Sequence, residues 1–298
     1  MNTAGRFAPS PSADLHLGNL RTALLAWLAA RARDAPFRLR IDDLDAARSR
    51  REFAQRQLAD LAALELAHDG EIPHQSARTP RYAAAFEQLR AAGHLYPCFC
   101  TRAELRAAAS APHGAPTAGY PGTCRTLTAA ECATRTRQLR DAGREPAWRF
   151  ASSRSAVIFN DQICGPQSLA ADDVVVRRAD GGFGYQLAVV VDDADQGVGE
   201  VVRGADLLDS TPTQLELHAR LELAPPQYAH VPLLLGPDGR RLAKRDGAPS
   251  LGDLHAGRHT LTLPGLPNGA AADPIAVRSV LAASVGLADP LERPTLAE

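Results

Sequence analysis

The sequence lacks the features that mark membrane and secreted proteins. Its longest apolar runs, residues 24–30 and 187–191, fall far short of the ~20 residues that a membrane-spanning helix needs. The N-terminus shows no charged segment followed by an apolar one, as a leader peptide would. The five cysteines are an odd number without the regular spacing of a disulfide framework. These absences predict a soluble, cytoplasmic protein with no membrane partner.

The net charge is close to zero, and lysine is rare. The formal net charge of −1 excludes a general attraction to nucleic acid, so any such contact must come from a local basic face. At 298 residues the chain is long enough for one large or two modest domains with ample core. No internal repeat or coiled-coil pattern is visible, and we expect a monomer.

Lysine occurs once, at Lys244, whereas arginine is abundant. Lys244 lies in a loop of glycine and arginine residues that follows an expected strand. Because a lysine ammonium is a compact and mobile charge, this position suits the binding of a polyphosphate. The alternative is that a single lysine falls in an exposed loop by chance.

The stretch from Arg6 to Arg21 predicts an anion-binding turn. A strand end at residues 5–8 is followed by two prolines that force an extended loop, and a helix begins near His16–Asn19. Free backbone N–H groups and the helix dipole are expected to point into the turn, and Gly18 lets a ligand approach the backbone. The alternative is an ordinary capped helix after a proline turn.

The following segments alternate between strand and helix. Residues 37–41 predict a strand that ends in the acidic run Asp42–Asp45, where carboxylates are well placed to hold a ligand. The alternative is that these carboxylates cap the next helix. Helical patterns cover residues 50–66 and 79–92, and the alternation indicates a parallel sheet.

The character of the chain changes near residue 95. From residue 124 to about 180 it holds short strands without clear sheet-crossover helices, which indicates an insertion between two halves of a domain. A strand at 200–204, a helix at 211–223 and a strand at 228–235 follow. After residue 245 only one modest helix is expected, around 275–285.

Three cysteines and a tyrosine form a candidate zinc site. One residue separates Cys98 from Cys100, and Cys124 together with Tyr120 can complete a tetrahedral set of four zinc ligands. The alternatives are that alternate cysteines on a strand are simply small buried side chains, or that His94 or His113 is the fourth ligand. We interpret the two remaining cysteines, Cys132 and Cys164, as structural.

Arg6, Arg203, Tyr185 and Asp42 come from separate segments, each at an expected strand end or helix start. If these residues meet in one pocket, the two guanidinium groups can bind the two carboxylates of glutamate or aspartate, and the Asp42 carboxylate can bind the ammonium of the same ligand. The alternative is that each arginine is an ordinary surface residue.

Taken together, these motifs resemble a class I aminoacyl-tRNA synthetase of the glutamyl type. The run Arg6-Phe-Ala-Pro-Ser-Pro, followed by His16-Leu-Gly18-Asn19, resembles the first ATP motif of that family, and Leu242-Ala-Lys244-Arg245 resembles the second. Residues 40–45 resemble the strand end that holds the amino-acid ammonium. The resemblance covers about residues 5–250 and implies a Rossmann-like α/β fold. The implied fold has a parallel sheet with helices on both faces, an inserted α+β zinc-containing domain and a short C-terminal helical tail.

This resemblance implies that the chain is divided into four parts. They are the first half of the catalytic domain (1–93), the inserted domain (94–182), the second half (183–245) and a C-terminal extension (246–298). Too little chain follows Lys244 for an anticodon-binding domain, so the chain is more similar to the truncated paralogues that glutamylate queuosine in tRNA(Asp). It departs from the family in carrying Asp42 for a usual Glu and Ala13 for a usual Gly. Its loop before Tyr120 is also longer.

The resemblance implies a role for each matched residue. Catalysis is implied for His16, Asn19 and Lys244. Binding of ATP, together with Mg²⁺, is implied for Pro9, His16, Gly18, Asn19, Lys244 and Arg245. Binding of L-glutamate is implied for Arg6, Ala8, Ser10, Asp42, Tyr185 and Arg203. One structural zinc ion is implied at Cys98, Cys100, Tyr120 and Cys124.

The implied activity is activation of glutamate by ATP without tRNA, followed by transfer to queuosine in the anticodon loop of tRNA(Asp). Two alternatives stay open. The chain can be the catalytic core of an ordinary glutamyl-tRNA synthetase that charges tRNA(Glu), or a non-catalytic RNA-binding relic of the synthetase fold. A measurement of adenylate formation separates the relic from both enzymes.

Overall fold

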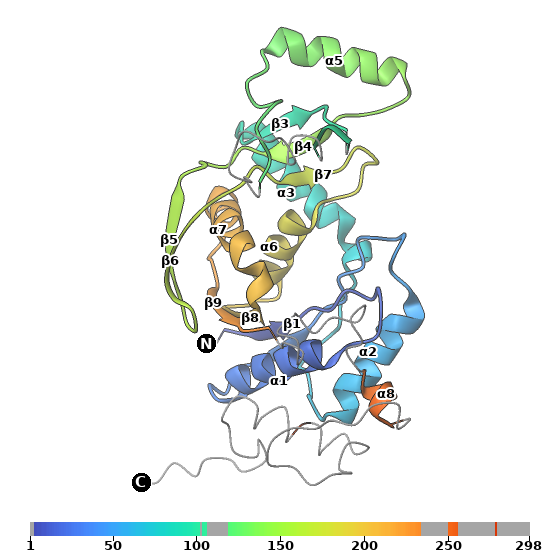
Figure 1. The fold of residues 1–298 in the computed structure, drawn as a ribbon, viewed down its shortest axis with the longest axis vertical. Helices are drawn as coiled ribbons and strands as arrows, with labels where there is room; N and C mark the ends of the chain where they lie inside the picture. The colour runs from blue at the N-terminus through green and yellow to red at the C-terminus, as the bar shows by residue number, and fades with distance from the viewer. Residues whose placement is uncertain (1–2, 102, 106–118, 234–249, 256–277, 279–298) are drawn as a thin grey trace. The chain divides into compact units, whose positions relative to one another are not determined.

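The computed structural model describes residues 3–101, 103–105, 119–233, 250–255 and 278 (Figure 1). Contacts divide the chain into two compact units. The first unit comprises Met1–Gln75, Gly197–Asp206 and Pro226–Glu298, and the second comprises Ser76–Gln196 and Leu207–Pro225. The four predicted domains stay a prediction.

Parallel strands form the centre of the first unit. Strand β1 (Gly5–Phe7) pairs in parallel with β2 (Phe37–Leu39), with Arg6 opposite Arg38. Strand β8 (Glu200–Gly204) pairs in parallel with β9 (Gln227–Val231). A parallel bridge between Ala4 and Val198 joins the two pairs. The predicted parallel arrangement is therefore confirmed for these strands.

The helices of the first unit are α1 (Leu17–Arg31), α2 (Arg51–Ala63) and the short α8 (Leu251–His255). Figure 1 shows α1 running beside β1 and β8. The approach is close, because a Cβ atom at Gly5 would lie 2.9 Å from the Cβ of Ala30. A side chain at position 5 would force the strand away from the helix.

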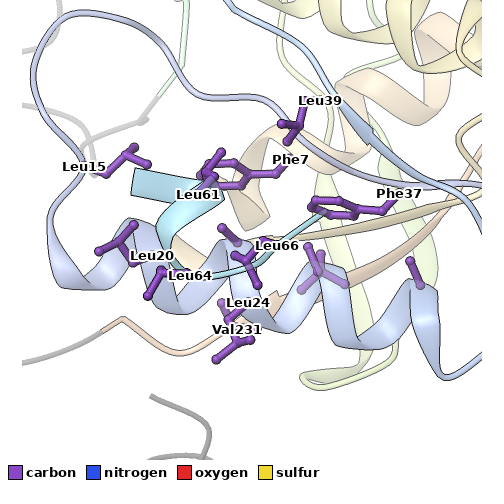
Figure 2. Close-up of a cluster of buried hydrophobic side chains, with 14 of the residues drawn as sticks. Phe7, Leu15, Leu20, Leu24, Phe37, Leu39, Leu61, Leu64, Leu66 and Val231 are labelled. Carbon is purple, nitrogen blue, oxygen red and sulfur yellow. The ribbon is translucent and has the colours of Figure 1, made fainter. Parts of the chain in front are cut away.

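The core of the first unit lies between these helices and strands (Figure 2). Phe7, Leu20, Leu24, Phe37 and Leu61 are all buried within it. Burying each such side chain contributes about 1.5–3 kcal/mol, so the packing of α1 and α2 on the strands accounts for much of the stability.

The second unit holds an antiparallel sheet and a hairpin. The sheet has the order β3 (Leu95–Cys98), β4 (Ala147–Phe150), β7 (Val175–Arg177), and both pairings are antiparallel. The hairpin is formed by β5 (Ala156–Asp161) and β6 (Gly165–Ala170). Short strands were expected in this segment.

Helices α3 (Thr79–Ala91), α6 (Tyr185–Asp195) and α7 (Thr211–Arg220) complete the body of the second unit. The buried carboxylate of Asp192 joins the start of α3 to α6, because it accepts hydrogen bonds from Arg78 Nε at 2.6 Å and from the Tyr82 hydroxyl. Two 3-10 turns, η1 (Gln75–Arg78) and η2 (Ala205–Ser210), precede α3 and α7.

The segment 124–180, for which short strands without clear sheet-crossover helices were predicted, also contains one helix, which lies between the antiparallel strands β3 and β4. Helix α5 (Ala129–Asp141) lies within this segment and begins with a capping box in which Thr128 and Glu131 hydrogen-bond to each other's backbone N–H. None of its residues is buried. A helix without a buried face has no apolar stripe, which is why the hydrophobic pattern did not reveal it.

Several element ends also fall earlier than predicted, and β2 ends at Leu39 and not at residue 41. Strand β9 ends at Val231 and not at residue 235, because Pro232 has no N–H to continue the ladder. Helices α2 and α7 end at Ala63 and Arg220, each just before a residue with positive φ. The helix expected at 275–285 lies outside the described residues except for Arg278. Among the described helices, none is long and apolar enough to cross a membrane.

Candidate functional site

The turn before α1 places His16 and Asn19 at the first residues of the helix. The Nδ1 atom of His16 accepts hydrogen bonds from the backbone N–H groups of Gly18 at 3.1 Å and Asn19 at 3.4 Å. In return, Asn19 Oδ1 accepts the backbone N–H of His16 at 3.3 Å. This reciprocal cap fixes both side chains. Because Nδ1 is an acceptor, the proton of the neutral imidazole is on Nε2.

The same contacts correct one part of the anion-site prediction. The backbone N–H groups of Gly18, Asn19 and Leu20 are not free, because they donate to the ring or carbonyl oxygen of His16. An anion at this turn would therefore meet the helix dipole and the His16 and Asn19 side chains. Gly18 has a further role, since a Cβ there would lie 3.0 Å from His16 Cε1 and would press on the ring.

The proline loop that precedes this turn is held by hydrogen bonds from other segments. Pro9 is buried, and its carbonyl oxygen accepts the backbone N–H of Asp42 at 3.0 Å. The carbonyl oxygen of Pro11 accepts the N–H of Arg50 at 2.9 Å. Ala8 is half-buried and Ser10 is exposed. Prolines lack N–H groups, so the loop depends on these outside donors.

Arg6 and Arg203 lie on neighbouring strands of the first unit. Arg6 of β1 is buried, and its Nη1 donates to the carbonyl oxygen of Val202 on β8 at 3.2 Å. Arg203 of β8 is also buried, with its Nε 3.0 Å from His230 Nε2 and its guanidinium 5.0 Å from the centre of the Tyr228 ring. The structure thus holds two guanidinium groups at one part of the parallel strands.

Asp42 directly follows β2, and a buried arginine holds its carboxylate. Arg40 Nε donates to Asp42 Oδ1 at 2.7 Å, and Arg40 has no exposed surface. A buried ion pair of this kind fixes the orientation of both groups. Arg40 belongs to the predicted ammonium-binding motif at residues 40–45, but its ion pair with Asp42 was not predicted, and His230 was not among the predicted site residues. Each is a buried polar residue in contact with a predicted substrate ligand. The sequence pattern of a strand does not show which of its polar residues are buried.

The other predicted ligands cannot be placed beside these. Tyr185 is the first residue of α6, it is 38% exposed, and it belongs to the second unit. That Tyr185 and Arg6 contribute to one glutamate site stays a prediction. Lys244 and Arg245 lie outside the described residues.

The described residues on either side of the Lys244 stretch contact α1 and its cap. The carbonyl oxygen of Pro232 accepts a hydrogen bond from Arg21 Nη1 on α1 at 2.7 Å. Ser250 forms an antiparallel bridge with His16. Leu251 is buried in the core of the first unit next to this bridge. Pro232 and Ser250 therefore both lie at the N-terminal half of α1.

The second unit contains a cluster of metal-ligand atoms. The sulfur atoms of Cys98, Cys100 and Cys124 all lie within 4.8 Å of one another, and those of Cys100 and Cys124 are 3.5 Å apart. The Tyr120 hydroxyl is 3.6 Å from the sulfur of Cys98 and 3.4 Å from that of Cys100. His94 is not in the cluster that the described residues form, and His113 lies outside those residues.

These distances fit a tetrahedral zinc ion. With Zn–S of about 2.3 Å and Zn–O of about 2.0 Å, a tetrahedron has S···S edges of about 3.8 Å and S···O edges of about 3.5 Å. Burial raises the pKa of the Cys100 thiol to about 12, so a cation is required to keep it ionised at neutral pH. Burial also acts on Cys124, but hydrogen bonds from Tyr120 and Phe99 outweigh it and lower the pKa of that thiol. The cluster can therefore hold a metal ion.

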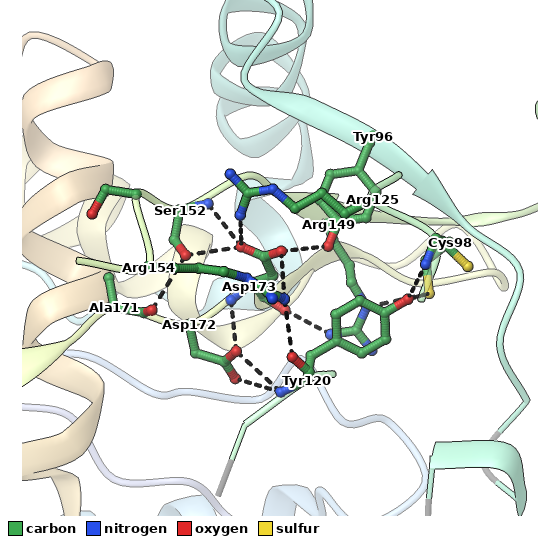
Figure 3. Close-up of polar contacts among 12 residues, drawn as sticks. Tyr96, Cys98, Tyr120, Arg125, Arg149, Ser152, Arg154, Ala171, Asp172 and Asp173 are labelled. Carbon is green, nitrogen blue, oxygen red and sulfur yellow. Dashed lines mark hydrogen bonds and ion pairs between the residues drawn. The ribbon is translucent and has the colours of Figure 1, made fainter. Parts of the chain in front are cut away.

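Arg149 connects the cluster to the sheet. Its Nε donates to the sulfur of Cys98 at 3.2 Å, its guanidinium lies 3.7 Å from the centre of the Tyr120 ring, and its Nη1 donates to the Asp173 carbonyl at 2.7 Å. Figure 3 shows this chain of contacts. A buried positive charge here offsets the negative charge of several thiolates.

The carboxylate of Asp173 is the centre of the remaining network (Figure 3). It is buried, and burial would raise its pKa, but hydrogen bonds and nearby guanidinium groups hold the pKa below the ordinary value. Its partners are Tyr96, Arg125, Ser152 and Arg154. The network makes the metal cluster part of one rigid polar core.

The fold and these sites define a class of protein. The sequence profile for the catalytic domain of class I tRNA synthetases (E and Q) matches residues 3–257. A solved glutamate tRNA ligase from Elizabethkingia meningosepticum, in complex with its amino acid, superposes with a TM-score of 0.72 and 29% identity. The match covers 83% of this chain and 53% of that one, so the chain spans about half the length of the ligase. The chain belongs to the class I tRNA synthetases for glutamate and glutamine.

Within this class the similarity is more specific. A protein of Nocardia farcinica named glutamyl-Q tRNA(Asp) synthetase is 57% identical over 250 residues, covering 84% of this chain and 78% of the relative. One of the same name from Symbiobacterium thermophilum is 53% identical over 266 residues, covering 85% and 81%. The chain therefore belongs with the glutamyl-Q tRNA(Asp) synthetases.

Proposed function

We propose that the chain activates L-glutamate with ATP in the absence of tRNA and transfers the glutamyl group to queuosine in the anticodon loop of tRNA(Asp). The names of its relatives support the acceptor and the amino acid. The observation that carries the activation step is the arrangement around α1, where the capped His16 turn pairs with Ser250 and Arg21 binds Pro232, the two described residues that flank the stretch containing Lys244.

Chain length limits how far Lys244 can lie from this turn. It is six residues from Ser250, and a fully extended chain spans at most about 3.6 Å per residue, so its Cα lies within about 22 Å of the Ser250 Cα. Ser250 pairs with His16. An ammonium restrained in this way can reach a triphosphate bound at the helix N-terminus, as the first and second ATP motifs require.

In the first step, an oxygen of the glutamate α-carboxylate attacks the α-phosphorus of ATP. A new P–O bond forms, and the bond to pyrophosphate breaks. His16 and Asn19 contact the triphosphate at the N-terminus of α1, and Lys244 neutralises charge on the departing pyrophosphate. Pro9, Gly18 and Arg245 line the same nucleotide site. Mg²⁺ bound with ATP supplies further charge neutralisation.

Glutamate binding is assigned to the carboxyl ends of β1, β2 and β8. Arg6 and Arg203 are buried guanidinium groups that we assign to its two carboxylates, and Asp42, oriented by Arg40, is assigned to its ammonium. Ala8, Ser10 and Tyr185 complete the proposed pocket.

In the second step, a hydroxyl of queuosine attacks the carbonyl carbon of the glutamyl-adenylate. A new ester bond forms, AMP leaves with the former bonding electrons, and the hydroxyl releases its proton. The proposed zinc ion, held by Cys98, Cys100, Tyr120 and Cys124, has a structural role in the second unit and takes no part in either step.

Exchange and charging assays test the proposal. We expect glutamate-dependent ATP–pyrophosphate exchange without tRNA, and glutamylation of tRNA(Asp) that contains queuosine but not of tRNA(Asp) that lacks it. Exchange that requires tRNA(Glu), together with charging of tRNA(Glu), would show an ordinary glutamyl-tRNA synthetase instead. Absence of exchange under all these conditions would indicate a non-catalytic relic.

A further inference from the structure

Helix α2 has one polar residue on its buried face. The buried residues of this helix are Ala54, Gln57 and Leu61, at spacings of three and four that mark a core-facing stripe. Gln57 is only 1% exposed. A primary amide on such a stripe is unfavourable unless other groups satisfy it. Its presence therefore calls for a specific partner.

The partner of Gln57 is the proline loop. Its Nε2 donates two hydrogen bonds, one to the carbonyl oxygen of Ser10 at 3.0 Å and one to that of Ala13 at 2.7 Å. Its Oε1 has no hydrogen-bond partner among the described residues. The opposite amide orientation would set this oxygen against two carbonyl oxygens. The two loop carbonyls thus fix which way the amide points.

The loop has few means of holding its own conformation. Pro9 and Pro11 have no N–H to donate, and within the loop the backbone N–H of Ser12 donates to Ser10. The Pro9 and Pro11 carbonyls are each bound from outside. Gln57 therefore supplies a buried side-chain link between the loop and a packed helix, beside the exposed ion pair of Arg56 with Asp14.

We propose that Gln57 is a positioning residue for this active site. By holding the carbonyls of Ser10 and Ala13 together, it sets the path of the chain from the proposed glutamate ligands to the His16 cap. It does not touch substrate itself. This inference rests on the proposed function, because the loop matters to catalysis only if it binds ATP and glutamate.

The test compares substitutions at Gln57 with the same substitutions at Gln55, which lies exposed on the same helix. Gln57→Leu keeps approximate size but removes both donors. We expect kcat/KM for ATP–pyrophosphate exchange to fall on the order of 10- to 100-fold, with a rise in KM for both ATP and glutamate, because small misplacements of binding groups have effects of this size. Gln55→Leu should stay within about twofold of the wild type.

A second pair of variants gives a pH readout, compared only over the pH range in which circular dichroism shows both variants to be folded. In Gln57→Glu, a carboxylate would face two carbonyl oxygens, whereas its protonated form can donate one hydrogen bond. The activity of Gln57→Glu divided by that of Gln55→Glu should therefore rise as the pH falls from 8 to 6. Asp14, Arg56 and Asp60 face the same loop or helix, but they are common to both variants and cancel in the ratio.

Amide hydrogen exchange separates failure of this inference from failure of the proposed function. The N–H groups of Ser12, Asp42 and Arg50 report on the loop because they donate to it. Even if the wild type shows no ATP–pyrophosphate exchange, faster amide hydrogen exchange at these positions in Gln57→Leu than in Gln55→Leu would still support the positioning of the loop by Gln57. Equal amide exchange, or kinetics equal to the Gln55 controls in folded Gln57 variants, would overturn it.

Discussion

Substitution of Gly18 by alanine should separate stability from activity. Gly18 is the second residue of α1, and an added Cβ would lie 3.0 Å from His16 Cε1 and 3.1 Å from Nδ1. Such contacts are shorter than an ordinary van der Waals separation, so the imidazole must move by a few tenths of an ångström or more. The ring cannot move without weakening its hydrogen bonds to the Gly18 and Asn19 N–H groups.

Two effects on the free energy of unfolding then oppose each other. Alanine is favoured over glycine in a helix by up to about 1 kcal/mol, and loss of a side-chain N-cap costs about 1 kcal/mol. We expect the net stability of Gly18→Ala to stay within about 1 kcal/mol of the wild type. Activity has no compensating gain, because His16 is displaced, and kcat/KM for exchange should fall on the order of 10- to 100-fold.

Gly252→Ala is the matched control. Gly252 is the second residue of α8, and a Cβ there would meet Ser250 Oγ at an ordinary 3.8 Å. Urea unfolding and glutamate-dependent ATP–pyrophosphate exchange should be measured for both variants. Wild-type exchange in Gly18→Ala would refute the role of the His16 ring. A fall of equal size in Gly252→Ala would show that the helix ends, and not the ring, control activity.

Three further predictions concern the metal cluster, the single lysine and a buried carboxylate. Cys100→Ser should lose zinc by metal analysis of protein purified without added metal, whereas Cys164→Ser, outside the cluster, should keep it; retained zinc in the first would exclude Cys100 as a ligand. Lys244→Ala should lower pyrophosphate exchange by orders of magnitude with an unchanged circular dichroism spectrum, and unaltered exchange would remove Lys244 from the mechanism. Burial raises the pKa of Asp60 to about 6, so the folded state binds its proton more tightly and this group destabilises the fold increasingly as the pH rises from 4 to 6. Asp60→Asn should therefore gain stability relative to the wild type at pH 8 but not at pH 4, as urea unfolding would show, and an equal difference at both pH values would contradict it.

Local patterns predicted the elements whose apolar faces pack in a core. Helices α1 and α2 and strands β1 and β8 were expected close to where they lie. The apolar residues of the two helices recur at helical spacing, and the two strands are short runs that are buried along their length. Helix α5 was missed because it buries no residue and so leaves no such signal. Prediction from periodicity thus depends on burial and not on helicity itself.

The candidate site was predictable to the extent that its residues belong to one motif. The cysteines and Tyr120 come together as their spacing indicated. The partners that orient the site were missed. Gln57 and His230 come from segments other than the groups they bind, and Arg40, although it lies within the motif at residues 40–45, carries no sign in the sequence that it is buried against Asp42. Only Gln57 left a usable trace, as an amide on an apolar stripe.

These missed residues share a physical reason for being where they are. Each is buried, and each bonds a group that the motifs alone leave uncompensated: loop carbonyls for Gln57, the Asp42 carboxylate for Arg40 and the Arg203 guanidinium for His230. Burying a polar group is unfavourable unless its partner is exact in position, so such a pair restricts both members to one geometry. A motif therefore specifies which groups meet the substrate, and the buried polar partners, near in sequence for Arg40 and distant for Gln57 and His230, determine how firmly those groups are held.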